Sequence, residues 1–307
     1  MKVLPFIPQC LRPARDLRLS AVLLRATALE LAILAGHLLL YPSGLASERR
    51  GPGRPQPNPN PSLNPSPSPS PSPERRASPL HEAVPADTTT LPTGSPAHPP
   101  VVLLHGFVDN RSVFVLLRRS LARHGWRHLE CLNYSPLTCD IRTAAELLGR
   151  HIEEICTRTG HREVDIVGHS LGGLIARYYV QRLGGDQRVR TLVTLGTPHS
   201  GTTVAPLASA HPIVRQMRPG SAVIEELRRP APGCRTRFVS FWSDLDQLMI
   251  PIETACIDHP DLVAQNVRVS GIGHLALPVH PAVAAGIRQA LESSESAAGA
   301  SGVVSVA

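Results

Sequence analysis

The sequence predicts one α/β domain in roughly the last two thirds of the chain, with a mostly parallel central sheet and helices on both faces. The composition changes near residue 101, because 16 of the 31 prolines lie between residues 51 and 100. From Val101 onward, short apolar runs alternate with amphipathic stretches, which is typical of strands alternating with helices in a parallel sheet. About 190 residues remain for this domain, enough to bury one core.

Residues 1–46 are expected to be a signal peptide or membrane anchor. Basic residues near the start precede an uncharged apolar run over 31–41, and Gly44 and Ala46 are the small residues that signal peptidase requires. An uncleaved spanning helix would bury Arg25 and Glu30, at about 2.5–3.5 kcal/mol each near the bilayer centre. A helix that lies in the membrane interface is the third alternative. We therefore predict an exported protein, either secreted or tethered to the outer face of the cytoplasmic membrane.

Residues 47–100 are predicted to be a Pro/Ser-rich disordered linker, since Asn-Pro and Ser-Pro repeats cannot build a core and favour extended polyproline II. The α/β domain is expected over 101–295, and 296–307 is expected to be a disordered tail. The net charge of +7 is not concentrated in one stretch, so no nucleic-acid partner is predicted. The six cysteines form no metal-binding spacing, and a Cys234–Cys256 disulfide is permitted outside the cytoplasm.

Apolar periodicity places the elements of this domain. In the helix expected over 112–123, Val115, Leu116 and Leu121 are the candidate core contacts, and Asp140 is a fitting N-cap for the helix from Ile141. The expected strands are 101–104, 129–132, 164–167, 189–195, 237–242 and 267–270, and the expected helices are 112–123, 141–156, 171–183 and 282–291.

One motif dominates the domain. Gly168-His169-Ser170-Leu171-Gly172 joins an apolar strand to an amphipathic helix, which is the context of a nucleophile elbow. The sharp turn brings strand and helix backbones almost into contact, so glycine is required on both sides of the serine. Ser170 is therefore the candidate nucleophile.

At these residues the sequence resembles the α/β-hydrolase superfamily, in its minimal form, and most closely the secreted bacterial (actinobacterial-type) triacylglycerol lipases and esterases. In that fold the triad follows the chain order Ser, Asp or Glu, His. His274, in the glycine-containing loop after the last expected strand, is the predicted base. The rivals His211, His259 and His280 each adjoin a proline, and the side chain of His169 should point away from the Ser170 hydroxyl.

The triad acid should follow the strand that begins at Arg237, where Asp244 and Asp246 both qualify by position. The resemblance to small bacterial lipases favours Asp246, which leads into an apolar turn. The oxyanion hole is expected from the backbone N–H groups of Leu171 and Phe107, the latter in a His-Gly loop like that of lipases.

The stretch Thr197-Pro198-His199 resembles one found in many lipases and is expected to shape the pocket wall, without a catalytic role for His199. Between Thr202 and Pro232, the apolar residues Val204, Leu207, Ile213, Val214 and Met217 form either a short lid or acyl-contact surface, or ordinary packing. The substrate-binding residues stay undefined.

The resemblance implies hydrolysis of carboxylic esters through an acyl-serine intermediate, with a lipid or acylglycerol-like ester as substrate and a lipid–water interface as a setting. No metal or organic cofactor is needed, although some lipases hold a structural calcium, and no obligate protein partner is predicted. Two alternatives stay open: an acyltransferase or thioesterase on the same triad, and a non-catalytic protein displayed on the proline-rich stalk.

Overall fold

The structure is a computed structural model of the 307-residue chain. It describes residues 24, 25, 27–36, 39, 98–107, 109–134, 140–204, 211–293 and 304–306. The expected linker, most of the expected tail and most of the first 46 residues lie outside the described residues. By its contacts the chain divides into one unit of residues 1–46 and 97–307 and another of 47–96. Within the described residues, no helix is both long enough and apolar enough to cross a membrane.

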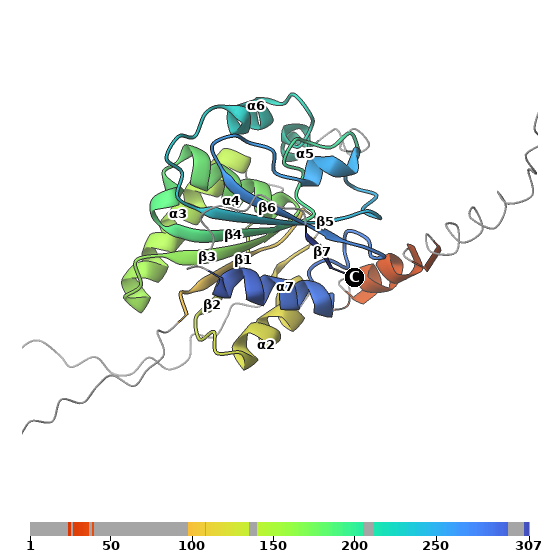
Figure 1. The fold of residues 1–307 in the computed structure, drawn as a ribbon, viewed down its shortest axis with the longest axis horizontal. Coiled ribbons are helices and arrows are strands. Elements are labelled where there is room, and N and C mark those ends of the chain that lie inside the picture. The colour runs from red at the N-terminus through yellow and green to blue at the C-terminus, as the bar shows by residue number, and fades with distance from the viewer. Residues whose placement is uncertain are drawn as a thin grey trace, which may run out of the picture. The chain divides into compact units, whose positions relative to one another are not determined.

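The first unit is built on a parallel sheet with the strand order β2-β1-β3-β4-β5-β6-β7 (Figure 1). Every neighbouring pair of strands runs parallel. The strands are β1 (Val101–Leu104), β2 (Leu129–Leu132), β3 (Val164–His169), β4 (Val189–Leu195), β5 (Arg237–Ser243), β6 (Val263–Val269) and β7 (Val304–Val306). Strand β7 lies within the stretch expected to be a tail and pairs with β6.

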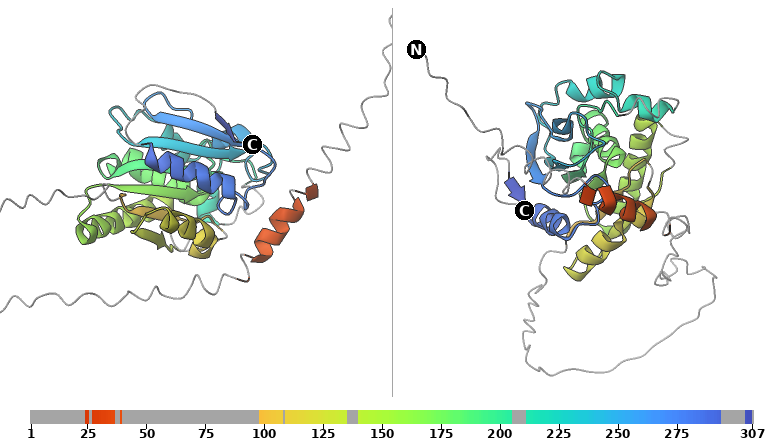
Figure 2. Two further views of the ribbon diagram at one scale, coloured as in Figure 1. Left: turned by 60° about the horizontal axis from the view of Figure 1, so that its bottom comes forward. Right: turned by 90° about the vertical axis from the view of Figure 1, so that its right-hand side faces the viewer.

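Helices cover both faces of the sheet, as expected. The α-helices of the α/β domain are α2 (Val115–Arg123), α3 (Ile141–Thr159), α4 (Leu171–Arg182), α5 (Pro212–Gln216), α6 (Ala222–Arg228) and α7 (Pro281–Glu292), and residues 27–36 are helical as well. Helices α3 and α4 lie on one face and α2 and α7 on the other (Figures 1 and 2). Alternate residues of β1 enter separate cores: Val102 and Leu104 pack with α3 and α4, whereas Val101 and Leu103 pack with α2 and α7.

Local sequence explains most of these boundaries. The Asp140 side chain accepts a hydrogen bond from the Thr143 N–H, which caps α3 as expected, and Gly160 ends that helix in a left-handed conformation. Strand β6 begins at Val263, four residues before the expected start at Val267, because its whole length pairs with β5. The short helices α5 and α6 were not predicted, since neither exceeds seven residues.

The predicted core face of α2 was wrong in part. The chain enters this helix through a 3₁₀ turn, Arg111–Phe114, which has three residues per turn in place of 3.6. The changed phase buries Val113 and Phe114, leaves Val115 only partly buried and exposes Leu116, while Leu121 is buried as expected.

The strand order fixes where a site can form. Strand β1 has β2 on one side and β3 on the other, so the chain changes direction across the sheet between β1 and β3. In open parallel sheets, ligands bind outside the carboxyl ends of the strands at such a switch point. The loop after β1 and the turn after β3 meet there, which brings the Gly106 and Ser170 region together.

Candidate active site

Ser170 occupies the sharp turn between β3 and α4. It has φ 51° and ψ −118°, and it is the one non-glycine residue with a positive φ among the described residues. Backbone strain of this kind is characteristic of functional turns and persists only where the surroundings enforce it.

The neighbouring glycines allow this turn. A Cβ at Gly168 would lie 2.6 Å from the Gly173 backbone, and one at Gly172 would lie 2.4 Å from the Leu104 carbonyl oxygen. Both contacts are far below van der Waals distance, so the strand and helix approach each other only without side chains here. The close approach expected from the sequence is therefore present, and it is the backbone that directs Ser170 to the edge of the sheet.

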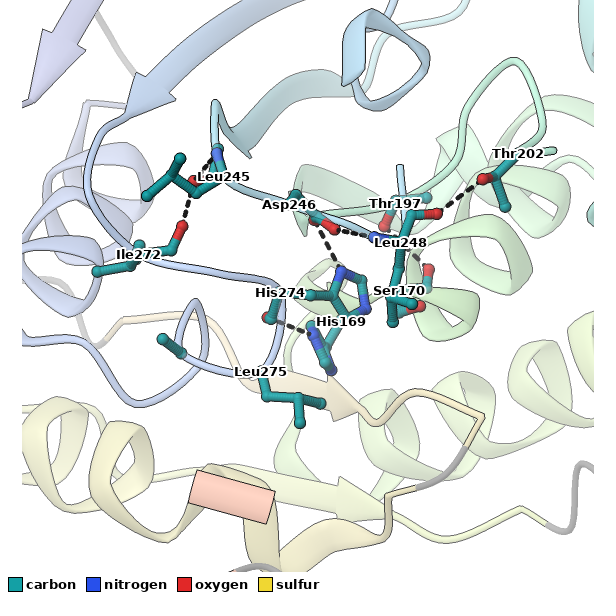
Figure 3. A network of polar contacts seen from close by, with 12 residues as sticks. His169, Ser170, Thr197, Thr202, Leu245, Asp246, Leu248, Ile272, His274 and Leu275 are labelled. Carbon is teal, nitrogen blue, oxygen red and sulfur yellow. Dashed lines mark hydrogen bonds and ion pairs between the residues drawn. The ribbon is translucent and has the colours of Figure 1, made fainter. Parts of the chain in front are cut away.

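His274 lies in the loop that follows β6, and its Nδ1 is 2.7 Å from Asp246 Oδ2. The His274 and Asp246 side chains are both buried, and Ser170 and His274 line the same pocket. Figure 3 shows Ser170 beside His274, while the Nδ1 side of that ring points to Asp246. A neutral histidine that donates from Nδ1 to a carboxylate keeps Nε2 free to accept a proton.

The pKa of His274 is raised above that of a free imidazole. Burial is the largest influence and lowers the pKa, but the charge and hydrogen bond of Asp246, with the charges of Asp109 and Glu30, outweigh it. The acidic groups around the ring therefore favour its protonated form more than a free imidazole would.

The structure separates the two candidate acids. Asp244 forms an ion pair with Arg268 at 2.9 Å and accepts a hydrogen bond from the Gly271 N–H. It therefore links the loop after β5 to the end of β6. Asp246 is buried, and its Oδ1 accepts from the Leu248 N–H while Oδ2 contacts His274. The geometry thus brings Asp246 and not Asp244 to the imidazole.

A second buried pair supports the same loop, and sequence reasoning missed it. His169 Nδ1 lies 3.2 Å from Asp109 Oδ2, and its Nε2 lies 3.2 Å from the His274 backbone carbonyl oxygen. The ring nitrogens of His169 are therefore directed to Asp109 and to the His274 carbonyl, and Figure 3 shows the latter contact. This is in keeping with the expectation that the ring points away from the Ser170 hydroxyl. Polar residues directly after β1 were the available signal for Asp109.

The other candidate histidines have different partners. His259 Nε2 contacts the Arg229 carbonyl, His211 accepts a hydrogen bond from the Ile213 N–H, and His280 precedes α7. His199 is fully buried against Thr194, and burial, reinforced by the charge of Arg177, lowers its pKa well below the usual value. It therefore stays neutral, which fits a structural residue.

The expected oxyanion donors lie on both sides of Ser170. Leu171 is the first residue of α4, directly after the turn, and Phe107 lines the pocket in the loop after β1. A Cβ at Gly106 would lie 3.3 Å from Ser170 Cβ, so the loop backbone approaches the serine closely. The roles of the two N–H groups stay predictions.

The pocket beside Ser170 has a volume of about 150 Å³. Of the apolar residues expected in the lid region, Val204, Val214 and Met217 line it, whereas Ile213 is buried in the core. Leu207 lies outside the described residues. Pro198 also lines the pocket, as expected of a wall residue, and the preceding Thr197 hydroxyl donates to the Ser170 carbonyl at 3.0 Å. The site presents a largely apolar surface to a ligand.

Cys234 and Cys256, for which a disulfide was permitted, are both free thiols in the structure, and so are Cys131 and Cys156. Burial raises the pKa of Cys256 to about 11 and raises that of Cys234 as well. Cys10 and Cys139 lie outside the described residues.

Comparisons with known proteins agree with this fold. Residues 99–229 match a family described as the alpha/beta hydrolase fold. A triacylglycerol lipase of Pseudarthrobacter phenanthrenivorans is 30% identical over 114 residues, covering 34% of this chain and 35% of the relative. One of Burkholderia plantarii is 31% identical over 114 residues, covering 34% and 31%. The match thus spans about a third of the length of these curated relatives.

Among solved structures, mature Bacillus licheniformis lipase BlEst2 matches with a TM-score of 0.54 at 17% identity, over 64% of this chain and 93% of that one. Aspergillus fumigatus lipase B matches with a TM-score of 0.50 at 17% identity, over 56% and 44%. At such identity the likeness concerns the fold. The family match and the elbow together support an α/β-hydrolase fold for this part of the chain, and triacylglycerol lipases are among the proteins to which it is similar.

Proposed function

We propose that the protein is a serine hydrolase that cleaves carboxylic esters of lipid type through an acyl-Ser170 intermediate. One observation carries the proposal: Ser170, on a strained turn, shares an apolar pocket with a buried histidine that hydrogen-bonds to a buried aspartate. A serine hydroxyl is a weak nucleophile on its own and needs this kind of assistance.

In this mechanism Asp246 holds His274 with Nδ1 protonated, so that Nε2 takes the proton from Ser170 as Oγ attacks the ester carbonyl. The Leu171 and Phe107 N–H groups stabilise the oxyanion, a contribution of about 2.7–4 kcal/mol for each donor. His274 then protonates the departing alcohol. In the second half of the cycle His274 deprotonates water, which attacks the acyl-enzyme and releases the acid and free Ser170.

The substrate class follows from the chemistry of the pocket. Val204, Val214 and Met217 offer no charge or hydrogen bond, so they suit an acyl chain better than a polar acyl group. The kinship with triacylglycerol lipases supports the same class. We also propose that the protein is exported, either secreted or tethered to the outer face of the cytoplasmic membrane. Cell fractionation tests this, and an active pool found only in the cytoplasm would contradict it.

The test is a series of p-nitrophenyl esters from acetate to palmitate with the full chain and Ser170→Ala. Loss of the hydroxyl should lower kcat by several orders of magnitude. Ser293→Ala is the matched control, since Ser293 is exposed after α7. If the folded wild type releases no nitrophenol at any chain length, ester hydrolysis is wrong as the main activity, and transfer to an added alcohol or thiol is the next assay.

A further inference from the structure

The N-terminal helical segment, residues 27–36, reaches the loop that carries His274. Glu30 Oε2 accepts a hydrogen bond from the Leu275 N–H at 2.8 Å, and Oε1 accepts one from the Ala276 N–H at 3.0 Å. Both oxygens of one carboxylate are thus used by the two residues that follow His274. Charge-assisted hydrogen bonds of this kind are about twice as strong as neutral ones, so Glu30 fixes the backbone on one side of the imidazole.

The loop is shaped to admit this carboxylate. A Cβ at Gly273 would lie 2.5 Å from Glu30 Cδ and 2.6 Å from its Cγ. The absent side chain at Gly273 is therefore the space that Glu30 fills. The neighbouring Ile33 packs against the core formed with α2 and α7, so the contact does not depend on Glu30 alone.

The same face of the segment borders a second pocket. Thr27, Glu30, Leu31 and Leu34 have the spacing of one helix face. They line a cavity of about 240 Å³ together with Leu245, Gln247, Leu248, His274 and Leu275. Leu248, His274 and Leu275 also line the pocket beside Ser170, so the two cavities meet at the candidate base.

The groups that face His274 are Asp246, Asp109, Glu30 and the ring of His169, whose centroid is 4.8 Å from that of His274. Three of them carry negative charge when ionised, and each of these raises the His274 pKa. Glu30 differs from the other two because it comes from outside the α/β domain expected over 101–295.

We propose that residues 27–36 remain in the active enzyme as part of its active site, in which Glu30 is a positioning residue for His274. The proposal rests on the hydrolase function proposed above. Glu30 acts through the backbone of Leu275 and Ala276 and through its charge, and does not touch the reacting ester. The proposal also means that the active enzyme keeps this segment, against removal of residues 1–46 by signal peptidase.

The experiment measures kcat, KM and the pH profile of kcat/KM for the full chain and for its variants Glu30→Gln, Glu30→Ala and Glu146→Gln. Glu146 is an exposed glutamate on α3, which makes it a matched control. We expect Glu30→Ala to lower kcat more than tenfold with a smaller change in KM, and Glu30→Gln to lower it less because the amide oxygen still accepts one bond.

The pH profile separates positioning from a merely structural role. Removing the Glu30 charge lowers the His274 pKa, so the acid limb should move to lower pH in both Glu30 variants and stay in place in Glu146→Gln. If the acid limb does not move in the Glu30 variants, or if their kcat equals that of Glu146→Gln, the proposal is overturned. An inactive wild type, or a Ser170→Ala variant as active as wild type, would overturn the hydrolase function and not this inference alone.

A double-mutant cycle tests the same contact independently, so that the proposal can still be judged if one single variant fails to fold. Gly273→Ala should displace the Glu30 carboxylate and reproduce much of the Glu30→Ala loss. In the double variant the two losses should not add, because the added methyl then has nothing to displace. Additive losses, or N-terminal sequencing that finds a fully active mature protein starting at Ser47, would contradict the proposal.

Discussion

At the scale of single residues, two aspartates that lie two positions apart after β5 have different environments. Asp246 is buried beside His274, whereas Asp244 pairs with Arg268. Asp246→Asn should lower kcat by about 10⁴-fold, because the amide favours the wrong tautomer of the imidazole. Asp244→Asn should stay within about threefold of wild type, since it alters one partly exposed ion pair. Steady-state kinetics of both variants checks this, and equal losses would refute the assignment of the acid.

Under the proposed mechanism, the pH dependence of catalysis is set by His274 as the base. The base must be neutral to accept the Ser170 proton, so kcat/KM should fall as the pH drops below the His274 pKa. Because Asp246, Asp109 and Glu30 raise that pKa from 6.5, the acid limb should lie above pH 6.5. A pH–rate profile with a soluble ester measures it. A limb below 6.5 would mean that burial, which acts in the opposite direction, dominates the environment.

The sequence indicates the candidate residues whose positions a local motif fixes, and the structure brings these residues together. The turn at Ser170 is specified by its own glycines, and the position of His274 after the last long strand narrows the choice of base. The contacts of Asp109 with His169, and of Glu30 with Leu275, join residues 60 and 245 positions apart. Such pairs depend on how the elements pack, and no spacing in the sequence encodes them. From the sequence alone, Glu30 indicated only that a membrane-spanning helix at this position would bury a charged residue.

At the scale of elements, the β3–α4 turn depends on backbone contact. A Cβ at Gly172 would meet the Leu104 carbonyl oxygen at 2.4 Å, and neither backbone can yield easily. Gly172→Ala should therefore destabilise the domain by about 1–3 kcal/mol, which lowers Tm by several degrees, about 2–4 °C per kcal/mol. Gly36→Ala is the control, because nothing lies within 4 Å of the added methyl. Thermal unfolding followed by circular dichroism distinguishes them, and equal Tm values would argue against a tight elbow.

Substrate selection is also a property of elements, if the second pocket takes an apolar chain of the ester. Leu31 lines that pocket, while the nearby Leu29 does not, and both are substantially exposed. Leu31→Ala should lower kcat/KM for long-chain esters by roughly tenfold at most and leave acetate unchanged. Leu29→Ala should leave the chain-length profile as it is. Matching profiles for the two variants would exclude the segment from substrate contact.

The positions of the long elements could largely be predicted from apolar periodicity, because a long apolar stripe such as that of α3 is compatible with a helix and not with a strand. The predictions failed where the period changed or the element was short. The 3₁₀ entry to α2 shifted its buried face, and α5 and α6 follow too few residues for a periodic pattern to form. Pairing with β5 also lengthened β6 beyond what its own apolar residues indicate.

At the scale of the whole molecule, the chain joins the N-terminal helical segment, residues 27–36, to β1 through the proline-rich stretch. A cleavage site for a sequence-specific protease placed within residues 57–73 would cut this connection without touching the described contacts. After cleavage, ester hydrolysis should persist in concentrated protein and fall on dilution, whereas the uncut chain should be insensitive to dilution. Activity that is independent of concentration after cleavage would contradict this expectation.

The reason lies in the contact of Glu30 with Leu275 and Ala276. The contacts between the described residues of the segment and the α/β domain are few, chiefly two hydrogen bonds and the packing of Ile33, and we expect so few contacts to be weak between separate molecules. A covalent connection supplies an effective concentration in the millimolar range for short flexible linkers, less for longer ones, and so makes a weak contact persistent. On this view the proline-rich stretch sets the local concentration of a catalytic component, and its length and integrity become determinants of enzyme activity.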